Sequence, residues 1–171
     1  MMPSPTPLPY PSTPDSLTFI MSLALPSTPL TAAHIDLLQR HASTAAHHAY
    51  APYSNFRVGA ALLLSAPPTA HAAIVSGCNV ENASYRLTSC AEQNAIAAAV
   101  ALHGPGIRIR AIAIANLNGA ACQPCGACRQ TILEFSSPDT LVIFPASNGS
   151  STQATIAELL PAGFVLPHDQ K

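Results

Sequence analysis

The sequence contains very little charge: Asp, Glu, Lys and Arg make up 9% of its 171 residues, against about 25% in a typical soluble domain. It has a single lysine, Lys171, no tryptophan and a formal net charge of −1. This shortage of positive charge argues against a surface that binds a nucleic-acid backbone. No apolar run approaches the ~18 residues that a membrane-spanning helix needs. So few charges favour a surface covered in part by further copies of the chain, although a biased, alanine-rich composition would also explain them.

The cysteines are few, odd in number and clustered. There are five, and Cys122, Cys125 and Cys128 fall within seven residues. A secreted disulfide scaffold is usually smaller and has an even number of cysteines at wider spacing. The pattern therefore predicts metal ligands in a protein of a reducing compartment, the cytoplasm.

Residues 1–30 differ in composition from the rest of the chain. They hold eight of the 17 prolines and neither lysine nor arginine. The apolar run Leu17–Leu25 is similar to the core of a signal peptide, but the basic segment and a small-residue cleavage site are missing. We expect a disordered or loosely docked extension at residues 1–30, followed by one folded domain at residues 31–171.

Helical and strand patterns alternate along the folded domain. Thr31 is the expected N-cap of the first helix. The expected elements, in chain order, are a helix at 31–50, strands at 56–64 and 74–79 joined by a turn at Pro67-Pro68, a helix at 88–102, a strand at 107–115, a helix at 124–135, a strand at 140–144 and a short helix at 155–160. This alternation predicts an α/β fold with a parallel or mixed sheet covered by helices.

Two short segments carry residues suited to metal chemistry, Cys90-Ala91-Glu92 and Pro124-Cys125-Gly126-Ala127-Cys128. Cys125 and Cys128 are three residues apart in the first turn of a helix and so share one face. Cys90 begins another helix. If both helices direct their N-termini into one cleft, three thiolates converge there, and the helix ends lower their pKa values. Three protein ligands leave a fourth position for water, as at a catalytic zinc site.

Glu92 follows Cys90 by two residues and therefore lies on another face of the helix. At a helix N-terminus, however, both side chains can reach the volume beyond the helix end. A carboxylate there can take a proton from water and pass it to a leaving group. The order Cys-x-Glu, then Pro-Cys-x-x-Cys, is the pattern of zinc deaminases in its three-cysteine form.

Other metal sites fit part of the same pattern. The spacing of Cys122, Cys125 and Cys128 is also found in iron–sulfur proteins, but no fourth cysteine followed by proline occurs downstream, and the Cys90-Ala91-Glu92 segment would be unexplained. A closed structural zinc site would need Cys78 or Cys122 as its fourth ligand. Otherwise Cys78 and Cys122 are expected to be ordinary buried thiols.

With these two segments and three others, the sequence resembles cytidine deaminases of the short-chain, homotetrameric kind. The resemblance extends from Thr31 to Pro167, and the other stretches are residues 51–62, residues 77–85, and Glu158-Leu159-Leu160-Pro161 followed by Phe164. It implies a three-layer α/β/α sandwich around a mixed sheet. It also implies one zinc ion per subunit, active sites shared between subunits, and hydrolysis of cytidine and deoxycytidine to uridine and deoxyuridine with release of ammonia, a reaction of pyrimidine salvage.

The resemblance also assigns roles to individual residues. Cys90, Cys125 and Cys128 match the zinc ligands, and Glu92 matches the group that moves protons. The remaining matches concern the substrate: Asn79 and Glu81 for the ribose hydroxyls, Phe56 for the base, and Ala83, Tyr85 and Phe164 for completing a neighbouring subunit's site.

Residue 93 departs from the family pattern. Most relatives have an arginine there that hydrogen-bonds the zinc thiolates, whereas Gln93 offers N–H donors without a positive charge. The expected electrostatic tuning of the zinc site differs accordingly.

Three alternative functions would also explain part of this pattern. A deaminase of another cytosine-like compound, such as a nucleoside antibiotic, is disfavoured by Asn79 and Glu81, which match a ribose-binding pair. A deaminase that edits nucleic acids is disfavoured by the net charge of −1. A zinc-stabilised binding module without catalysis is supported only by Gln93.

Overall fold

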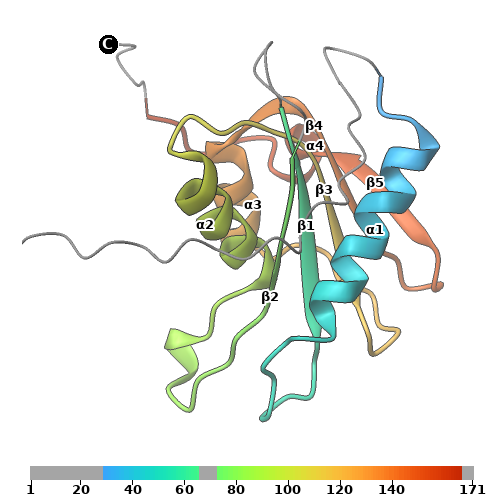
Figure 1. Cartoon of the computed structure of the whole chain (residues 1–171), viewed down its shortest axis with the longest axis vertical. Helices are drawn as coiled ribbons and strands as arrows, with labels where there is room; N and C mark the ends of the chain where they lie inside the picture. The colour runs from blue at the N-terminus through green and yellow to red at the C-terminus, as the bar shows by residue number, and fades with distance from the viewer. Residues whose placement is uncertain (1–28, 66–72, 167–171) are drawn as a thin grey trace, which may run out of the picture.

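A mixed sheet of five strands forms the centre of the domain, with helices on both of its faces (Figure 1). The computed structural model describes residues 29–65 and 73–166. The strand order is β2-β1-β3-β4-β5. β3 and β4 run parallel, and the other neighbouring strands are antiparallel. The predicted α/β fold with a mixed sheet is therefore confirmed. Almost all of the predicted extension and the predicted Pro67-Pro68 turn lie outside the described residues.

The helices and strands follow the predicted order. Their bounds are α1 Ala32–Ala46, β1 Val58–Leu64, β2 Ile74–Cys78, η1 Tyr85–Leu87 (a 3₁₀ helix), α2 Ala91–His103, β3 Ile109–Asn116, α3 Gly126–Glu134, β4 Ser136–Pro145, β5 Ser151–Thr155 and α4 Ile156–Leu159. Two elements were not predicted, η1 and the edge strand β5. β4 also begins before the predicted residue 140, at a polar segment that includes Pro138.

The helix α1 covers one face of the sheet. Its N-cap is Thr31, as predicted, whose side chain accepts a hydrogen bond from the backbone N–H of His34. The buried side chains Leu38 and Ala42 pack against Ala61 and Leu63 of β1 and against three residues of the adjoining strands: Ala111, Ala113 and Ile143. Leu38 and Ala42 are four residues apart and so lie on one face of α1. Because the side chains in this contact are apolar and many are small, α1 packs closely against the sheet.

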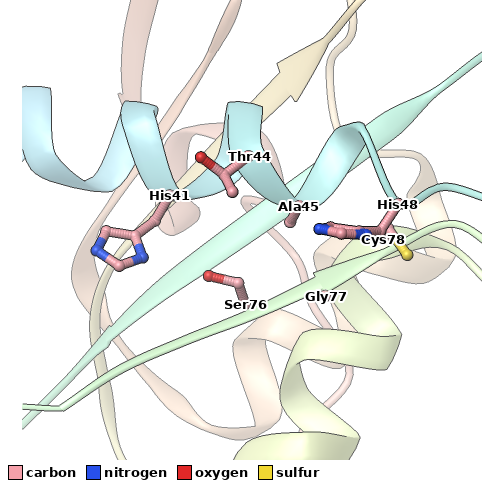
Figure 2. A pocket seen from close by; sticks show the side chains of 7 residues that line it. All are labelled: His41, Thr44, Ala45, His48, Ser76, Gly77 and Cys78. Atoms are coloured by element: carbon pink, nitrogen blue, oxygen red, sulfur yellow. The ribbon is translucent and has the colours of Figure 1, made fainter. Parts of the chain in front are cut away.

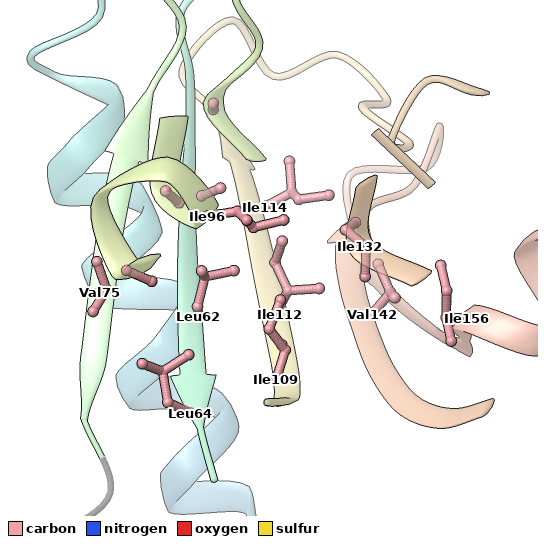
Figure 3. Close-up of a cluster of buried hydrophobic side chains, with 14 of the residues drawn as sticks. Leu62, Leu64, Val75, Ile96, Ile109, Ile112, Ile114, Ile132, Val142 and Ile156 are labelled. Atoms are coloured by element: carbon pink, nitrogen blue, oxygen red, sulfur yellow. The ribbon is translucent and has the colours of Figure 1, made fainter. Parts of the chain in front are cut away.

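The helices α2, α3 and α4 cover the other face. Alternate residues of β1 and β3, Leu62, Ile112 and Ile114 among them, pack there with Ile96, Ile132 and Ile156 from the three helices (Figure 3). Every residue of β1 is buried, because this inner strand is apolar on both faces. The two helical layers and the sheet form the predicted three-layer arrangement.

Gly59 allows α1 to approach β1 closely. A Cβ at this position would lie 2.0 Å from the carbonyl oxygen of Ala42 and 2.4 Å from the backbone N of Ala46. Gly59→Ala is therefore expected to lower the melting temperature by several degrees, since overpacking typically costs ~1–3 kcal/mol. Gly106→Ala is the matched control, because nothing lies within 4 Å of a Cβ there. Equal melting temperatures for the two variants would contradict this account of the packing.

Candidate active site

Two helix N-termini bring three thiols together. Cys90 is the N-cap of α2, and Cys125 is the N-cap of α3, where its Sγ accepts a hydrogen bond from the backbone N–H of Cys128 at 3.5 Å. The Sγ atoms of Cys90, Cys125 and Cys128 all lie within 4.8 Å of one another. Both helices lie on the same face of the sheet (Figure 1). The structure thus brings together the three cysteines that the sequence predicted as ligands.

The thiol cluster fits a zinc ion. Zn–S bonds of about 2.3 Å in a tetrahedral site place sulfur atoms about 3.8 Å apart, and the three Sγ atoms need only small movements to reach this spacing. Among the described residues, the group of potential ligands does not extend to Cys78 or Cys122. A closed four-cysteine site and an iron–sulfur run through Cys122 therefore lack a ligand. Both of these thiols are half-buried rather than fully buried.

The three thiols compete for protons. A hydrogen bond from the Cys128 thiol lowers the pKa of Cys90 to about 7. The same hydrogen bond, together with burial, raises the pKa of Cys128 well above its usual range. A proton on Cys128 therefore stabilises the thiolate of Cys90. A bound dication removes this conflict, because its charge stabilises several thiolates at once.

Glu92 lies in the first turn of α2, two residues after Cys90. Its side chain is 4% exposed. Burial raises its pKa above the usual range, an effect partly opposed by hydrogen bonds from its own backbone N–H and from the Cys128 thiol. A buried carboxyl group with a raised pKa, in contact with the thiol cluster, holds a proton more readily than an exposed one, as a general acid and base requires.

The two residues expected to bind ribose also hold the loop before β1. Asn79 accepts a hydrogen bond from the backbone N–H of Val58 at 2.8 Å and donates one to the carbonyl of Phe56 at 2.9 Å. The Glu81 carboxylate accepts hydrogen bonds from the hydroxyl and backbone N–H of Ser54 and from the backbone N–H of Tyr53. These bonds lower the pKa of Glu81, so its carboxylate is ionised at neutral pH. The hydrogen bond from the Asn79 side chain to the Phe56 carbonyl holds Phe56 beside Asn79.

The remaining predicted substrate residues are exposed on this single chain. Phe56 is 37%, Tyr85 87% and Phe164 67% exposed, and Ala83 also lies at the surface. The backbone of Phe164 is nevertheless fixed, because the Gln130 side chain donates to its carbonyl at 2.6 Å and accepts from its N–H at 3.1 Å. No other part of the described residues, 29–65 and 73–166, covers these side chains, and their roles stay predictions.

Gln93, which the sequence singled out, is partly buried in the first turn of α2, and its role toward the thiolates stays a prediction.

Three further side chains that support the site were missed in the sequence. The side chain of Arg129 donates to the carbonyls of Pro124 and Leu159. Asn94 and Gln130 also bridge separate segments through their side-chain amides. Arg129 and Gln130 directly follow Cys128, and their polar side chains beside the metal ligand were the available signal.

A cavity of about 350 Å³ lies elsewhere, between α1 and β2 (Figure 2). Its lining residues come from the C-terminal half of α1, the residues just beyond it, and β2: His41, Thr44, Ala45, His48, Ser76, Gly77 and Cys78. It shares no residue with the thiol cluster or Glu92.

No helix in the described part of the chain is long and apolar enough to cross a membrane.

Comparisons with known proteins agree with this geometry. The cytidine and deoxycytidylate deaminase zinc-binding region matches residues 33–144. A cytidine deaminase of Halalkalibacterium halodurans is 40% identical over 130 residues, which are 75% of this chain and 92% of that protein. The solved cytidine deaminase of Burkholderia pseudomallei is 40% identical, covers 75% of this chain and 98% of its own, and has a TM-score of 0.66. That of Mycobacterium tuberculosis is 38% identical, with 77% and 98% covered and the same TM-score.

Proposed function

The chain belongs to the cytidine deaminase family of zinc-dependent hydrolases, and we propose that Cys90, Cys125 and Cys128 hold its zinc ion while Glu92 moves the protons. The reaction is the hydrolysis of cytidine and deoxycytidine to uridine and deoxyuridine, with release of ammonia. The observation that carries the assignment is the buried Glu92 carboxyl, which is hydrogen-bonded to Cys128, one of three clustered thiols. The test is turnover of cytidine by the purified protein, followed by ultraviolet absorbance and by ammonia release.

The protein's own residues account for the proton movements. A zinc ion on the three thiolates supplies a Lewis acid that makes water acidic enough to react near neutral pH. Glu92 accepts one proton from the attacking water and delivers it to the ring nitrogen N3. It then transfers the second proton of that water to the exocyclic amine, which leaves as ammonia while the oxygen remains on C4. Burial of Glu92 suits it to both steps, since a raised pKa favours the protonated form from which the proton is passed on.

Asn79 and Glu81 hold the sugar in this proposal. They are the first and third residues after β2, and both hydrogen-bond to the loop that carries Phe56. The ionised Glu81 carboxylate accepts hydrogen bonds from ribose hydroxyls, and Phe56 packs on the pyrimidine ring. These contacts favour a nucleoside over a free base, because they engage the sugar and the ring together.

We also propose that four copies assemble into a homotetramer whose active sites are shared. The connections between α1 and β1 and between β2 and α2, the second of which contains η1, lie at the same end of the sheet (Figure 1). They carry large apolar side chains that are exposed: Tyr50, Tyr53, Val80, Tyr85 and Leu87. Exposed apolar groups gathered in this way are typical of a protein–protein interface. Ala83, Tyr85 and Phe164 complete the site of a neighbouring subunit.

Replacement of the Phe164 ring tests the shared site. Phe164→Ala is expected to raise the KM for cytidine ~3–10-fold, because an aromatic contact contributes ~0.5–1.5 kcal/mol beyond the area it buries. Val165→Ala, at an equally exposed neighbour, is the control and should leave KM unchanged. Sedimentation gives the oligomeric state of both variants. An active protein that sediments as a monomer would exclude the shared site.

The cytoplasm is the proposed location. All five cysteines are free thiols, and this favours a reducing compartment. The proposed catalytic domain is residues 31–171, with residues 1–30 as an extension of unassigned role.

A further inference from the structure

We propose that Asn94 is a positioning residue for the reaction, and that it holds the ribose-binding strand end in register with the helix start that carries Cys90 and Glu92. The inference rests on the proposed function, since it concerns two parts of the same active site. Asn94 belongs to neither part. Its side chain connects them.

The side-chain amide of Asn94 makes two hydrogen bonds. Nδ2 donates to the carbonyl of Cys78 at 2.8 Å and to Oγ of Ser89 at 2.9 Å. Cys78 is the last residue of β2 and immediately precedes Asn79, whereas Ser89 immediately precedes Cys90. An amide nitrogen has two hydrogens, and both are used here. One group therefore ties the residue before the ribose site to the residue before the first metal ligand.

Close backbone contact beside Asn94 sets the distance that this amide spans. A Cβ at Gly77 would lie 2.4 Å from the backbone N of Ala95 and 2.9 Å from the carbonyl carbon of Asn94. The first turns of α2 thus rest directly on the backbone of β2. Steric contact fixes how near the helix lies, but it does not fix how far the helix slides along the strand. The directional hydrogen bonds of Asn94 supply that constraint.

The fold has other bonds at this junction, so loss of Asn94 should not unfold it. Val80 and Ser89 exchange two backbone hydrogen bonds, each of 3.0 Å. The backbone N–H of Asn94 also donates to the carbonyl of Cys90 at 3.0 Å. These bonds remain when the side chain is replaced. What is lost is the direct tie between the last residue of β2 and the first turns of α2, so the helix can shift along the strand while the fold persists.

Register matters because a nucleoside must contact both parts at once. Its sugar binds at Asn79 and Glu81 while its C4 atom must lie beside Glu92 and the thiol cluster. A misplacement of about 1 Å can cost ~10²-fold in rate. We therefore expect Asn94→Ala to lower kcat/KM for cytidine by ~10–100-fold. Ser89→Ala removes one of the two hydrogen bonds and should have a smaller effect in the same direction.

The experiment combines a double-mutant cycle with zinc release. Asn94→Ala, Glu81→Gln and the double variant are compared in kcat/KM, because coupled residues give non-additive losses. Asn148→Ala is the control, since Asn148 caps its own turn between β4 and β5. Zinc transfer to a chromogenic chelator is timed for each protein. We expect the Asn94→Ala loss to be at least threefold smaller when Glu81 is already replaced, and zinc release to be several-fold faster than in the control.

Additive losses in the cycle, or zinc release equal to that of the control, would overturn the positioning role. If Asn94→Ala fails to fold, the same two readouts on Ser89→Ala decide the question. A wild-type protein that binds zinc but leaves cytidine unchanged would instead refute the proposed function. Zinc release would still report on the junction in that case, so the two failures can be told apart.

Discussion

Glu92→Gln is expected to reduce kcat for cytidine by ~10²–10⁴-fold while zinc stays bound. The amide has nearly the same shape as the carboxyl group, so it should fit the same buried site, where Glu92 is 4% exposed. It cannot accept a proton from water and return it to the ring or to the amine. Cys90 and Cys125 do not depend on it for their positions, because they are helix N-caps, and Cys128 is held in the first turn of α3.

The controls for Glu92→Gln separate proton transfer from metal binding. Asp36→Asn replaces an exposed carboxylate that pairs with Arg40 on α1 and should leave turnover unchanged. Zinc content is measured for every variant. A loss of less than tenfold would assign the proton transfer to another group, and loss of zinc would show that Glu92 supports the metal site instead.

Cys125→Ala is expected to remove zinc and activity together. Two thiolates cannot hold a catalytic zinc tightly against competing chelators. Cys125 is exposed, so its replacement leaves no cavity in the core. It does remove an N-cap acceptor from α3, which typically costs ~1 kcal/mol.

A second variant at this position separates the loss of zinc from the loss of the N-cap hydrogen bond of α3. Cys125→Ser retains a capping oxygen but offers zinc a poor ligand, so it should fold with near-normal stability and still lose zinc. Cys78→Ala and Cys122→Ala, at thiols outside the cluster, should keep zinc and turnover. Stoichiometric zinc with normal turnover in Cys125→Ser would refute the ligand assignment.

The metal centre was predictable because its information is local in the sequence. Cys90 and Cys125 stand at helix starts, and a helix N-terminus directs its first side chains into the space beyond its end. Cys128 follows in the same turn as Cys125. With the two helices on one face of the sheet and their N-termini directed to the same place, the three thiols meet.

The edge strand β5 was not predictable from its residues. Ser151–Thr155 is mostly polar, and it lacks the apolar alternation that identifies a half-buried strand. Its partner β4 supplies the apolar residues of the pair, while β5 contributes backbone hydrogen bonds at the edge of the sheet. The early start of β4 was hidden for the same reason, because its first four residues, Ser136 to Asp139, are polar or proline.

Asn94 was missed because its importance is not local. It lies in an alanine-rich helix where a polar residue usually marks the solvent face. Its partners, Cys78 and Ser89, become neighbours only when α2 packs on β2. The side chains of Asn79 and Glu81 likewise hold residues more than twenty positions away in the chain, and no sequence spacing shows such contacts.

The most direct test of the account is zinc-dependent turnover of cytidine by the purified wild-type chain. Absorbance and ammonia are measured before zinc is removed by a chelator, after its removal, and after zinc is added back. The account predicts one ammonia for each uridine formed, loss of both products without zinc, and recovery of both when one zinc per chain is restored. Undiminished turnover in zinc-free protein, or no turnover with zinc bound to all three cysteines, would contradict it.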